Sequence, residues 1–259
     1  MRYYVVDAFT DHVFGGNPAG VCVLDAPVPD ALMQQIAAEN NLPDTAFLLP
    51  DGDVYGLRWF KPRMEVDLCG HATLASGYVV TQFLSPGSRR AAFRTAQCGM
   101  LYAERDGDRI MLDFPARRAV PCAVPDGLAE ALGTTILETY QSRDTLAVVE
   151  SEAVVAAMRP DFTKLKRYSD TFGFVVTAKG SRIDFVSRFF GTSIGDDEDP
   201  VTGSSHATLI PFWSERLHKT KMTAAQLSAR GGVLYCEDKG ERVFIGGKAV
   251  CYLQGEILL

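Results

Sequence analysis

The sequence predicts an α+β fold made of two copies of one unit, and three observations support this prediction. The tetrapeptide His-Ala-Thr-Leu occurs at 71–74 and again 135 residues later, at 206–209. A second match, 133 residues apart, joins LYAERDGDRIML at 101–112 to LYCEDKGERVFI at 234–245. Ordered matches at a nearly constant offset indicate an internal duplication. In each half, short strands flank one apolar helix, without the strict strand–helix alternation of a parallel sheet.

In the first half, β-branched and aromatic residues predict strands, and a turn-rich loop is expected at 15–20. Pro29 and Asp30 open a first helix, which ends at 40–43. A helix over 71–83 carries no charge, so we expect it to be buried. Asp106-Gly107-Asp108 predicts a hairpin. The expected strands are 3–8, 21–24, 46–49, 55–60, 93–95, 100–105 and 109–114.

The second half repeats this plan. Helices are expected at 152–158 and 206–217, with Pro211 as a site of kinking in the latter. The expected strands are 146–150, 174–177, 184–190, 233–237 and 242–245. Residues 115–126 contain three prolines and are expected to be the linker, which places the predicted domains at 1–116 and 117–259.

Composition excludes several classes of function. The chain has 259 residues, of which 47% are hydrophobic and 22% charged, as in a globular protein of two domains. A net charge of −6 without a Lys/Arg cluster argues against nucleic-acid binding. No apolar run approaches the roughly 18 residues that span a bilayer, and the N-terminus lacks a signal-peptide pattern. We therefore expect a cytoplasmic protein with reduced thiols.

The six cysteines do not predict a metal site. None lies in a C-x-x-C motif, and Cys69 alone lies near a histidine, two residues before His71. Because no second Cys/His pair is close in the sequence, we expect no metal.

Both apolar helices begin at a glycine-containing turn, which favours anion binding. The N–H groups of a first helical turn are unpaired and carry partial positive charge. The second turn, Thr202-Gly203-Ser204-Ser205, adds hydroxyl groups. The simpler alternative is that Ser204 or Ser205 only caps the helix. His71 and His206 occupy matching positions, where a histidine is more often structural than catalytic.

Two acidic positions are candidates for proton transfer. Asp44 lies between a turn and an apolar strand, where a half-buried carboxylate could act as a general acid or base. A surface turn aspartate is the simpler interpretation of the same residues. Asp199 precedes the second helix, where an acid also complements the helix dipole without any further function.

The sequence resembles the PhzF-like family of phenazine-biosynthesis isomerases, within the diaminopimelate-epimerase-like fold. The resemblance rests on ordered motifs that run almost end to end. These are VVDAFTDHVFGGNPAGV, ENNLPDTAF, LRWFKP, DLCGHATLAS, EDPVTGSSHATLIPFW and RGGVLY. It implies two pseudo-symmetric domains, each a rolled, mostly antiparallel sheet around a central helix. It also implies an active site in the interdomain cleft and a last strand that pairs back onto the first domain.

The resemblance implies a cofactor-independent isomerase that moves a proton between carbons of a small carboxylated metabolite, in biosynthesis. By motif position, the implied catalytic residues are Asp44, His71 and Asp199. The implied substrate-binding residues are Asn17, Gly70, Gly203, Ser204 and Ser205. The expected partners are the carboxylate substrate and, in a homodimer, a second copy of the chain.

One departure from the family concerns Asp44, where the family usually has glutamate. Losing one methylene retracts the carboxylate by roughly 1.5 Å, and misplacement by about 1 Å can cost roughly a hundredfold in rate. Alternatives therefore stay open: an epimerase or racemase of a small acid, or a non-catalytic small-acid-binding protein. A two-thiol racemase is disfavoured, because Cys69 matches its first thiol but 199–204 contains no cysteine.

Overall fold

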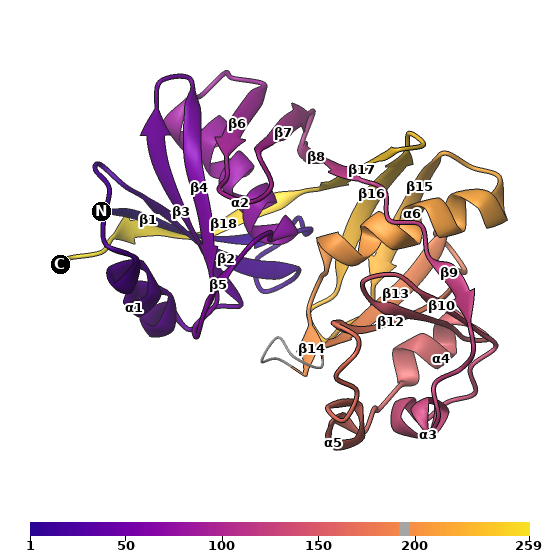
Figure 1. The fold of residues 1–259 in the computed structure, drawn as a ribbon. Coiled ribbons are helices and arrows are strands. Elements are labelled where there is room, and N and C mark those ends of the chain that lie inside the picture. The colour runs from indigo at the N-terminus through magenta and orange to yellow at the C-terminus, as the bar shows by residue number, and fades with distance from the viewer. Residues whose placement is uncertain (192–196) are drawn as a thin grey trace. The chain divides into compact units, whose positions relative to one another are not determined.

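The computed structural model describes residues 1–191 and 197–259, which form two compact units. Unit 1 comprises 1–113 and 246–259, and unit 2 comprises 114–245. The chain thus leaves unit 1 once and returns to it near its C-terminus (Figure 1). Among the described residues, no helix is long and apolar enough to cross a membrane.

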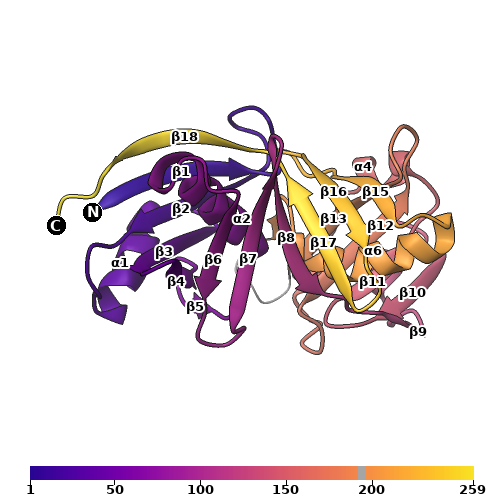
Figure 2. The same ribbon diagram turned by 90° about the horizontal axis from the view of Figure 1, so that it is seen from above.

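Unit 1 is a curved, mostly antiparallel sheet around one buried helix (Figures 1 and 2). Its strands pair in the order β18–β1–β2–β3–β4–β6–β7–β8, and β5 also pairs with β4. Only β2–β3 and β4–β6 are parallel pairs among these. The strands are β1 (Arg2–Ala8), β2 (Asn17–Val23), β3 (Asp44–Asp51), β4 (Val54–Phe60), β5 (Glu65–Val66), β6 (Arg90–Arg94), β7 (Met100–Asp106), β8 (Arg109–Pro115) and β18 (Ala249–Glu256).

Helix α2 (Gly70–Val79) forms the centre of unit 1, as its uncharged sequence predicts. It contacts β1, β2, β3 and β7, and a short π-helical segment, Val80–Leu84, extends it. Gly77 allows the close approach to β7, since a Cβ there would lie 2.5 Å from the Cβ of Ala103. On the other face of the sheet, α1 (Asp30–Asn40) ends at Asn41 in a left-handed conformation and buries Met33, Ile36 and Ala37.

Unit 2 repeats this arrangement. Its strands pair in the order β9–β10–β11–β12–β13–β15–β16, β14 also pairs with β13, and β17 forms a hairpin with β16. The parallel pairs are β11–β12 and β13–β15. The strands are β9 (Val120–Cys122), β10 (Glu138–Gln141), β11 (Thr145–Val148), β12 (Gly173–Lys179), β13 (Phe185–Gly191), β14 (Glu198–Asp199), β15 (Lys221–Gln226), β16 (Gly232–Asp238) and β17 (Arg242–Gly247).

Helix α6 (Gly203–Leu217) is the counterpart of α2 and continues through Pro211. Its Trp213 stacks on Phe185 and donates a hydrogen bond to Thr177 Oγ1 at 2.9 Å. Three short helices, α3 (Leu128–Leu132), α4 (Glu152–Ala157) and α5 (Phe162–Leu165), contribute Leu132, Val155 and Leu165 to an apolar core with β12 and β13.

The structure confirms the predicted α+β class and corrects several elements. The loop predicted at 15–20 is wrong beyond Gly16, because β2 already begins at Asn17. The second apolar helix begins at Gly203, three residues before the predicted start. The predicted linker contains β9 at Val120–Cys122. The strands β5 and β14 were not predicted, because two residues are too few to show an alternating hydrophobic pattern.

Candidate functional site

The first group of candidate residues, in unit 1, lies where α2 begins beside the first residues of β2 and β3. Asn17 is the first residue of β2 and Asp44 the first of β3. These strands are parallel neighbours, with Ala19 opposite Asp44, so both polar residues lie at the same end of the sheet. Cys69 precedes α2 as its N-cap, and Gly70 and His71 form the first turn.

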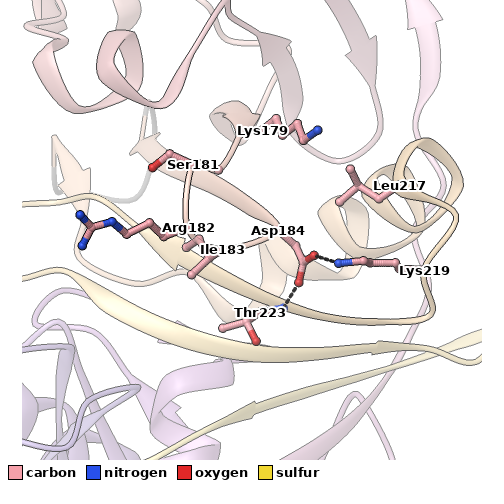
Figure 3. Close-up of a pocket in the computed structure, with 9 residues that line it drawn as sticks. Lys179, Ser181, Arg182, Ile183, Asp184, Leu217, Lys219 and Thr223 are labelled. Atoms are coloured by element: carbon pink, nitrogen blue, oxygen red, sulfur yellow. Dashed lines mark hydrogen bonds and ion pairs between the residues drawn. The ribbon is translucent and has the colours of Figure 1, made fainter.

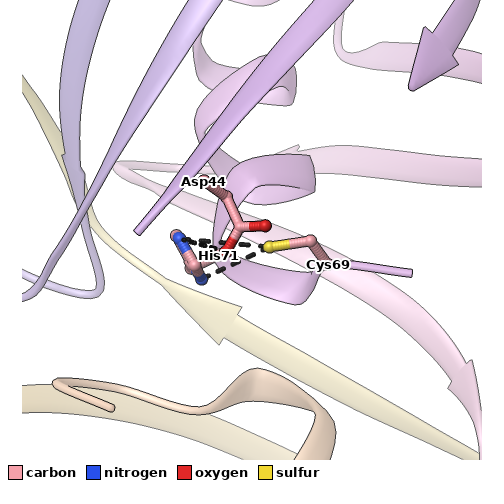
Figure 4. A group of neighbouring side chains, drawn as sticks. All are labelled: Asp44, Cys69 and His71. Atoms are coloured by element: carbon pink, nitrogen blue, oxygen red, sulfur yellow. Dashed lines mark hydrogen bonds and ion pairs between the residues drawn. The ribbon is translucent and has the colours of Figure 1, made fainter. Parts of the chain in front are cut away.

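His71 is the centre of this group. Its Nε2 lies 3.6 Å from Asp44 Oδ2, and its Nδ1 lies 3.2 Å from Asn17 Nδ2. The sulfur of Cys69 lies 3.4 Å from Nδ1 and 3.9 Å from Nε2 (Figure 4). The exposed fractions of Asp44, His71 and Cys69 are 2%, 5% and 7%. The interpretation of Asp44 as a surface turn residue is therefore wrong, and a buried carboxylate faces a buried imidazole.

The His71 imidazole is neutral at physiological pH. Burial, together with the charge of Lys61, lowers its pKa to about 3. The Asn17 amide donates toward Nδ1 in the assigned orientation, which leaves the ring proton on Nε2, facing Asp44. His71 thus directs this N–H toward the carboxylate, at a distance slightly beyond that of a hydrogen bond.

Lys61 is a component of this group that sequence reasoning missed. Its ammonium lies 3.4 Å from Asp44 Oδ2 and 3.4 Å from the carbonyl oxygen of Pro43. A cation at this distance stabilises negative charge on the carboxylate. The segment LRWFKP contains Lys61, but only folding shows that the end of β4 lies beside the start of β3.

The second group, in unit 2, surrounds the start of α6. Thr202 is the N-cap and makes no side-chain capping bond, so the alternative that Ser204 or Ser205 is the N-cap is wrong. Thr202 Oγ1 instead donates to Asp199 Oδ2 at 2.6 Å. The buried Gln226 accepts from Thr202 N at 2.9 Å and donates to the Asp199 carbonyl at 2.7 Å. Asp199 is thereby fixed against the first turn of α6.

Ser205 and His206 both bond to the N-cap residue. Ser205 Oγ donates to the carbonyl of Thr202 at 2.8 Å, and His206 Nδ1 lies 2.9 Å from the same oxygen. The His206 Nδ1 must therefore carry the proton. Its Nε2 is buried and has no hydrogen-bond partner among the described residues. Burial lowers the pKa of His206 to about 4, so this ring is neutral as well.

Arg143 reaches the same helix start, and sequence reasoning missed it too. Its Nε and Nη2 donate to the two oxygens of the buried Asp144 at 3.0 and 2.8 Å. Nη2 also donates to Ser204 Oγ at 3.1 Å, and the guanidinium lies 4.3 Å from the Phe172 ring centre. Among the residues that the structure describes, nothing accepts a hydrogen bond from Nη1. The adjacent Arg143-Asp144 pair was the only signal in the sequence.

A pocket of about 620 Å³ elsewhere in unit 2 contains none of these residues. It lies between the loop 179–184 and the residues Leu217, Lys219 and Thr223 (Figure 3). Inside it, the Asp184 carboxylate accepts hydrogen bonds from Lys219 Nζ at 2.5 Å and Thr223 N at 2.8 Å. Asp184, the acidic residue of this pocket, is thus already paired with Lys219. We therefore do not take this pocket as the candidate functional site.

Comparison with known proteins identifies the family. The family model for phenazine biosynthesis-like proteins matches residues 6–255. An uncharacterised isomerase of Pseudomonas aeruginosa is 51% identical over 260 residues, covering 100% of this chain and 99% of the relative. The human phenazine biosynthesis-like domain-containing protein is 36% identical over 285 residues, covering 99% of each chain.

Solved structures agree with this result. A PhzF family protein of Enterococcus faecalis superposes with a TM-score of 0.97 at 46% identity, covering 100% of this chain and 99% of the other. A probable proline racemase of Agrobacterium radiobacter shares the fold alone, with a TM-score of 0.62 at 10% identity, covering 100% and 93%.

Two units, each of mostly antiparallel strands around a buried helix whose first turn adjoins acidic and histidine side chains, form a fold that this chain shares with PhzF proteins and with a probable proline racemase. Within that fold, the chain belongs to the PhzF family of phenazine biosynthesis-like proteins.

Proposed function

We propose that this protein is a cofactor-independent isomerase that moves a proton between carbons of a small carboxylated metabolite. The observation that carries the proposal is the buried Asp44 carboxylate, 3.4 Å from Lys61 Nζ and 3.6 Å from the neutral His71. Such a carboxylate can take a proton from one carbon and return it to another. Because the site excludes most water, the proton is retained between the two steps.

The roles of the other residues follow from their contacts. His71 directs its Nε2 toward Asp44 from 3.6 Å, while Lys61, at 3.4 Å, stabilises the ionised form of the carboxylate. The first turn of α6 and the Nη1 group of Arg143 are suited to bind the substrate carboxylate, since both present N–H donors. That both groups act on one substrate molecule stays a prediction.

The runner-up function is epimerisation, in which the proton returns to the same carbon from the opposite face. It requires a second group that carries a proton. Cys69, the N-cap of α2, and Asp199, which accepts a hydrogen bond from the N-cap of α6, are two candidates for this group. The chirality of the product separates the two reactions. A binding protein without activity would show neither reaction.

Solvent deuterium incorporation tests the proposal. A thermal-shift screen of small anionic acids would first identify a bound acid. Mass spectrometry in D₂O would then measure deuterium uptake at its carbons. We expect uptake with the wild type and at least a hundredfold loss with Asp44→Asn, whose binding of the acid should change little. The matched control is Asp53→Asn, which replaces an exposed aspartate in the turn between β3 and β4. Unchanged uptake in Asp44→Asn would remove Asp44 from the mechanism.

A further inference from the structure

Three buried side chains of unit 1 bring together the donor atoms that zinc prefers. The carboxylate of Asp44, the thiol of Cys69 and the imidazole of His71 each offer one atom, and these atoms lie within 4.8 Å of one another. Oxygen, sulfur and imidazole nitrogen are the usual zinc ligands, and three protein ligands with one open position are typical of reactive zinc sites. Figure 4 shows the three side chains as neighbours at the start of α2.

The distances between donor atoms fit tetrahedral coordination. Ligands about 2.0–2.3 Å from a tetrahedral zinc ion lie roughly 3.3–3.8 Å from one another. His71 Nε2 lies 3.6 Å from Asp44 Oδ2 and 3.9 Å from Cys69 Sγ. Nε2 therefore needs to approach each of the other two donors by only a few tenths of an ångström, while the Asp44 and Cys69 donors lie within 4.8 Å of one another. Because Sγ lies closer to Nδ1, at 3.4 Å, the imidazole ring must also turn to bring Nε2 toward the sulfur.

The surroundings of the three donors also suit a metal ion. His71 is neutral, so Nε2 can offer a lone pair once its proton moves to Nδ1. The buried Asn17 amide, 3.2 Å from Nδ1, can rotate so that its oxygen accepts a hydrogen bond from Nδ1–H, as outer-shell partners of metal-bound histidines do. Lys61 opposes binding, because its ammonium lies 3.4 Å from Asp44 Oδ2.

We propose that Asp44, Cys69 and His71 bind a Zn²⁺ ion or a similar thiophilic divalent cation, and leave its fourth position open. The Cys69 thiol loses its proton to solvent as the Zn–S bond forms, and no oxidation state changes. The spacing of cysteines and histidines along the sequence does not predict this site, because its third donor is a carboxylate on β3. If the proposed function is correct, the ion competes with proton transfer for the Asp44 carboxylate and inhibits the enzyme.

Titration of chelator-treated protein with Co²⁺ tests the site without any substrate. We expect one equivalent to bind, with a thiolate-to-cobalt charge-transfer band and intense tetrahedral bands, and Zn²⁺ should abolish both. Cys69→Ser should remove the charge-transfer band and weaken binding roughly tenfold or more. The matched control is Cys98→Ser, which replaces an exposed thiol and should leave the titration unchanged.

A second variant keeps the test decisive if Cys69→Ser folds poorly. Lys61→Met should tighten Co²⁺ binding roughly tenfold, because it removes the positive charge beside Asp44. Binding without a thiolate band, or equal affinity in wild type, Cys69→Ser and Lys61→Met, would overturn the proposal. Neither result bears on deuterium uptake by the metal-free wild type. Failure of the metal site and failure of the proposed reaction are therefore distinguishable.

Discussion

At the scale of single residues, the side chain of Asp44, one methylene shorter than glutamate, determines how close its carboxylate comes to Lys61 and His71. Its contacts with Lys61 Nζ at 3.4 Å and His71 Nε2 at 3.6 Å are longer than the roughly 2.7–3.2 Å of a good hydrogen bond. The carboxylate therefore stops short of these two groups, and one more methylene would let it reach further.

We accordingly expect Asp44→Glu to retain or raise the rate of deuterium uptake. The position is 2% exposed, so the added methylene should cost about 1–3 kcal/mol of stability through overpacking. Uptake kinetics and urea unfolding measure the two effects separately. A tenfold slower rate in a folded variant would show that the site has adapted to aspartate.

The two buried histidines predict a loss of stability in acid. Burial lowers the pKa of His71 to about 3 and that of His206 to about 4, whereas both titrate near 6.5 in the unfolded chain. Between those values the unfolded state binds more protons, so stability rises with pH and falls as pH drops below about 6.5. Each histidine should remove about 2 kcal/mol between pH 7 and pH 5.

His206→Asn tests this at one position. The asparagine amide can keep the bond to the Thr202 carbonyl, which lies 2.9 Å from His206 Nδ1, but it does not titrate. Urea unfolding at pH 7 and pH 5 should show a smaller acid loss in the variant than in the wild type. His218→Asn, a replacement of an exposed histidine at the end of α6, is the matched control.

At the scale of elements, the fit of α2 against β7 depends on Gly77. An added Cβ would lie 2.5 Å from Ala103 Cβ and 3.2 Å from Ile110 Cγ2, both buried. Gly77→Ala should therefore destabilise the protein by about 1–3 kcal/mol in chemical unfolding, despite the better helix propensity of alanine. Gly56→Ala, whose nearest new contacts are 3.7 Å away, should cost less. Equal stability of the two variants would contradict this packing.

The sequence predicted elements well where one pattern dominated, as in the uncharged residues of α2. It failed at β2, because Gly16 and Pro18 favour a turn. The strand exists because β1 pairs along its whole length, while pairing with β3 begins only at Ala19, after the proline. Tertiary pairing here overrides local preference.

The candidate site was predictable only in part, for a related reason. Asp44, His71 and Asp199 stand in motifs. The sequence, however, does not indicate that Lys61 contacts Asp44, that Gln226 contacts Asp199 or that Arg143 contacts Ser204. Lys61 follows the end of β4, Gln226 ends β15 and Arg143 precedes β11, and only the folded sheet brings these ends to the helix starts. A single sequence carries no record of such long-range pairs.

At the scale of the whole molecule, the last strand completes the first unit. β18 pairs with β1 from Arg2↔Glu256 to Ala8↔Ala249, so residues from both ends of the chain share one sheet. The two tryptophans report on the units separately, since the buried Trp59 lies in unit 1 and the buried Trp213 in unit 2. The matched pairing of β2–β3 and β11–β12, both parallel, supports our proposal of an internal duplication.

Deletion of 249–259 should destabilise unit 1 more than unit 2. It removes the hydrogen bonds of a seven-residue pairing with β1, which at about 0.5–1.5 kcal/mol each amounts to a loss on the order of 3–10 kcal/mol. In a Trp213→Phe background, the fluorescence of Trp59 should show that the deletion moves the unfolding midpoint of unit 1 to lower urea. In a Trp59→Phe background, the fluorescence of Trp213 should show a smaller change in the midpoint of unit 2. Deleting only the exposed Leu258 and Leu259 is the control and should move neither transition. Equal shifts of both reporters in the long deletion would contradict independent units, because they would show that the chain unfolds in one cooperative step.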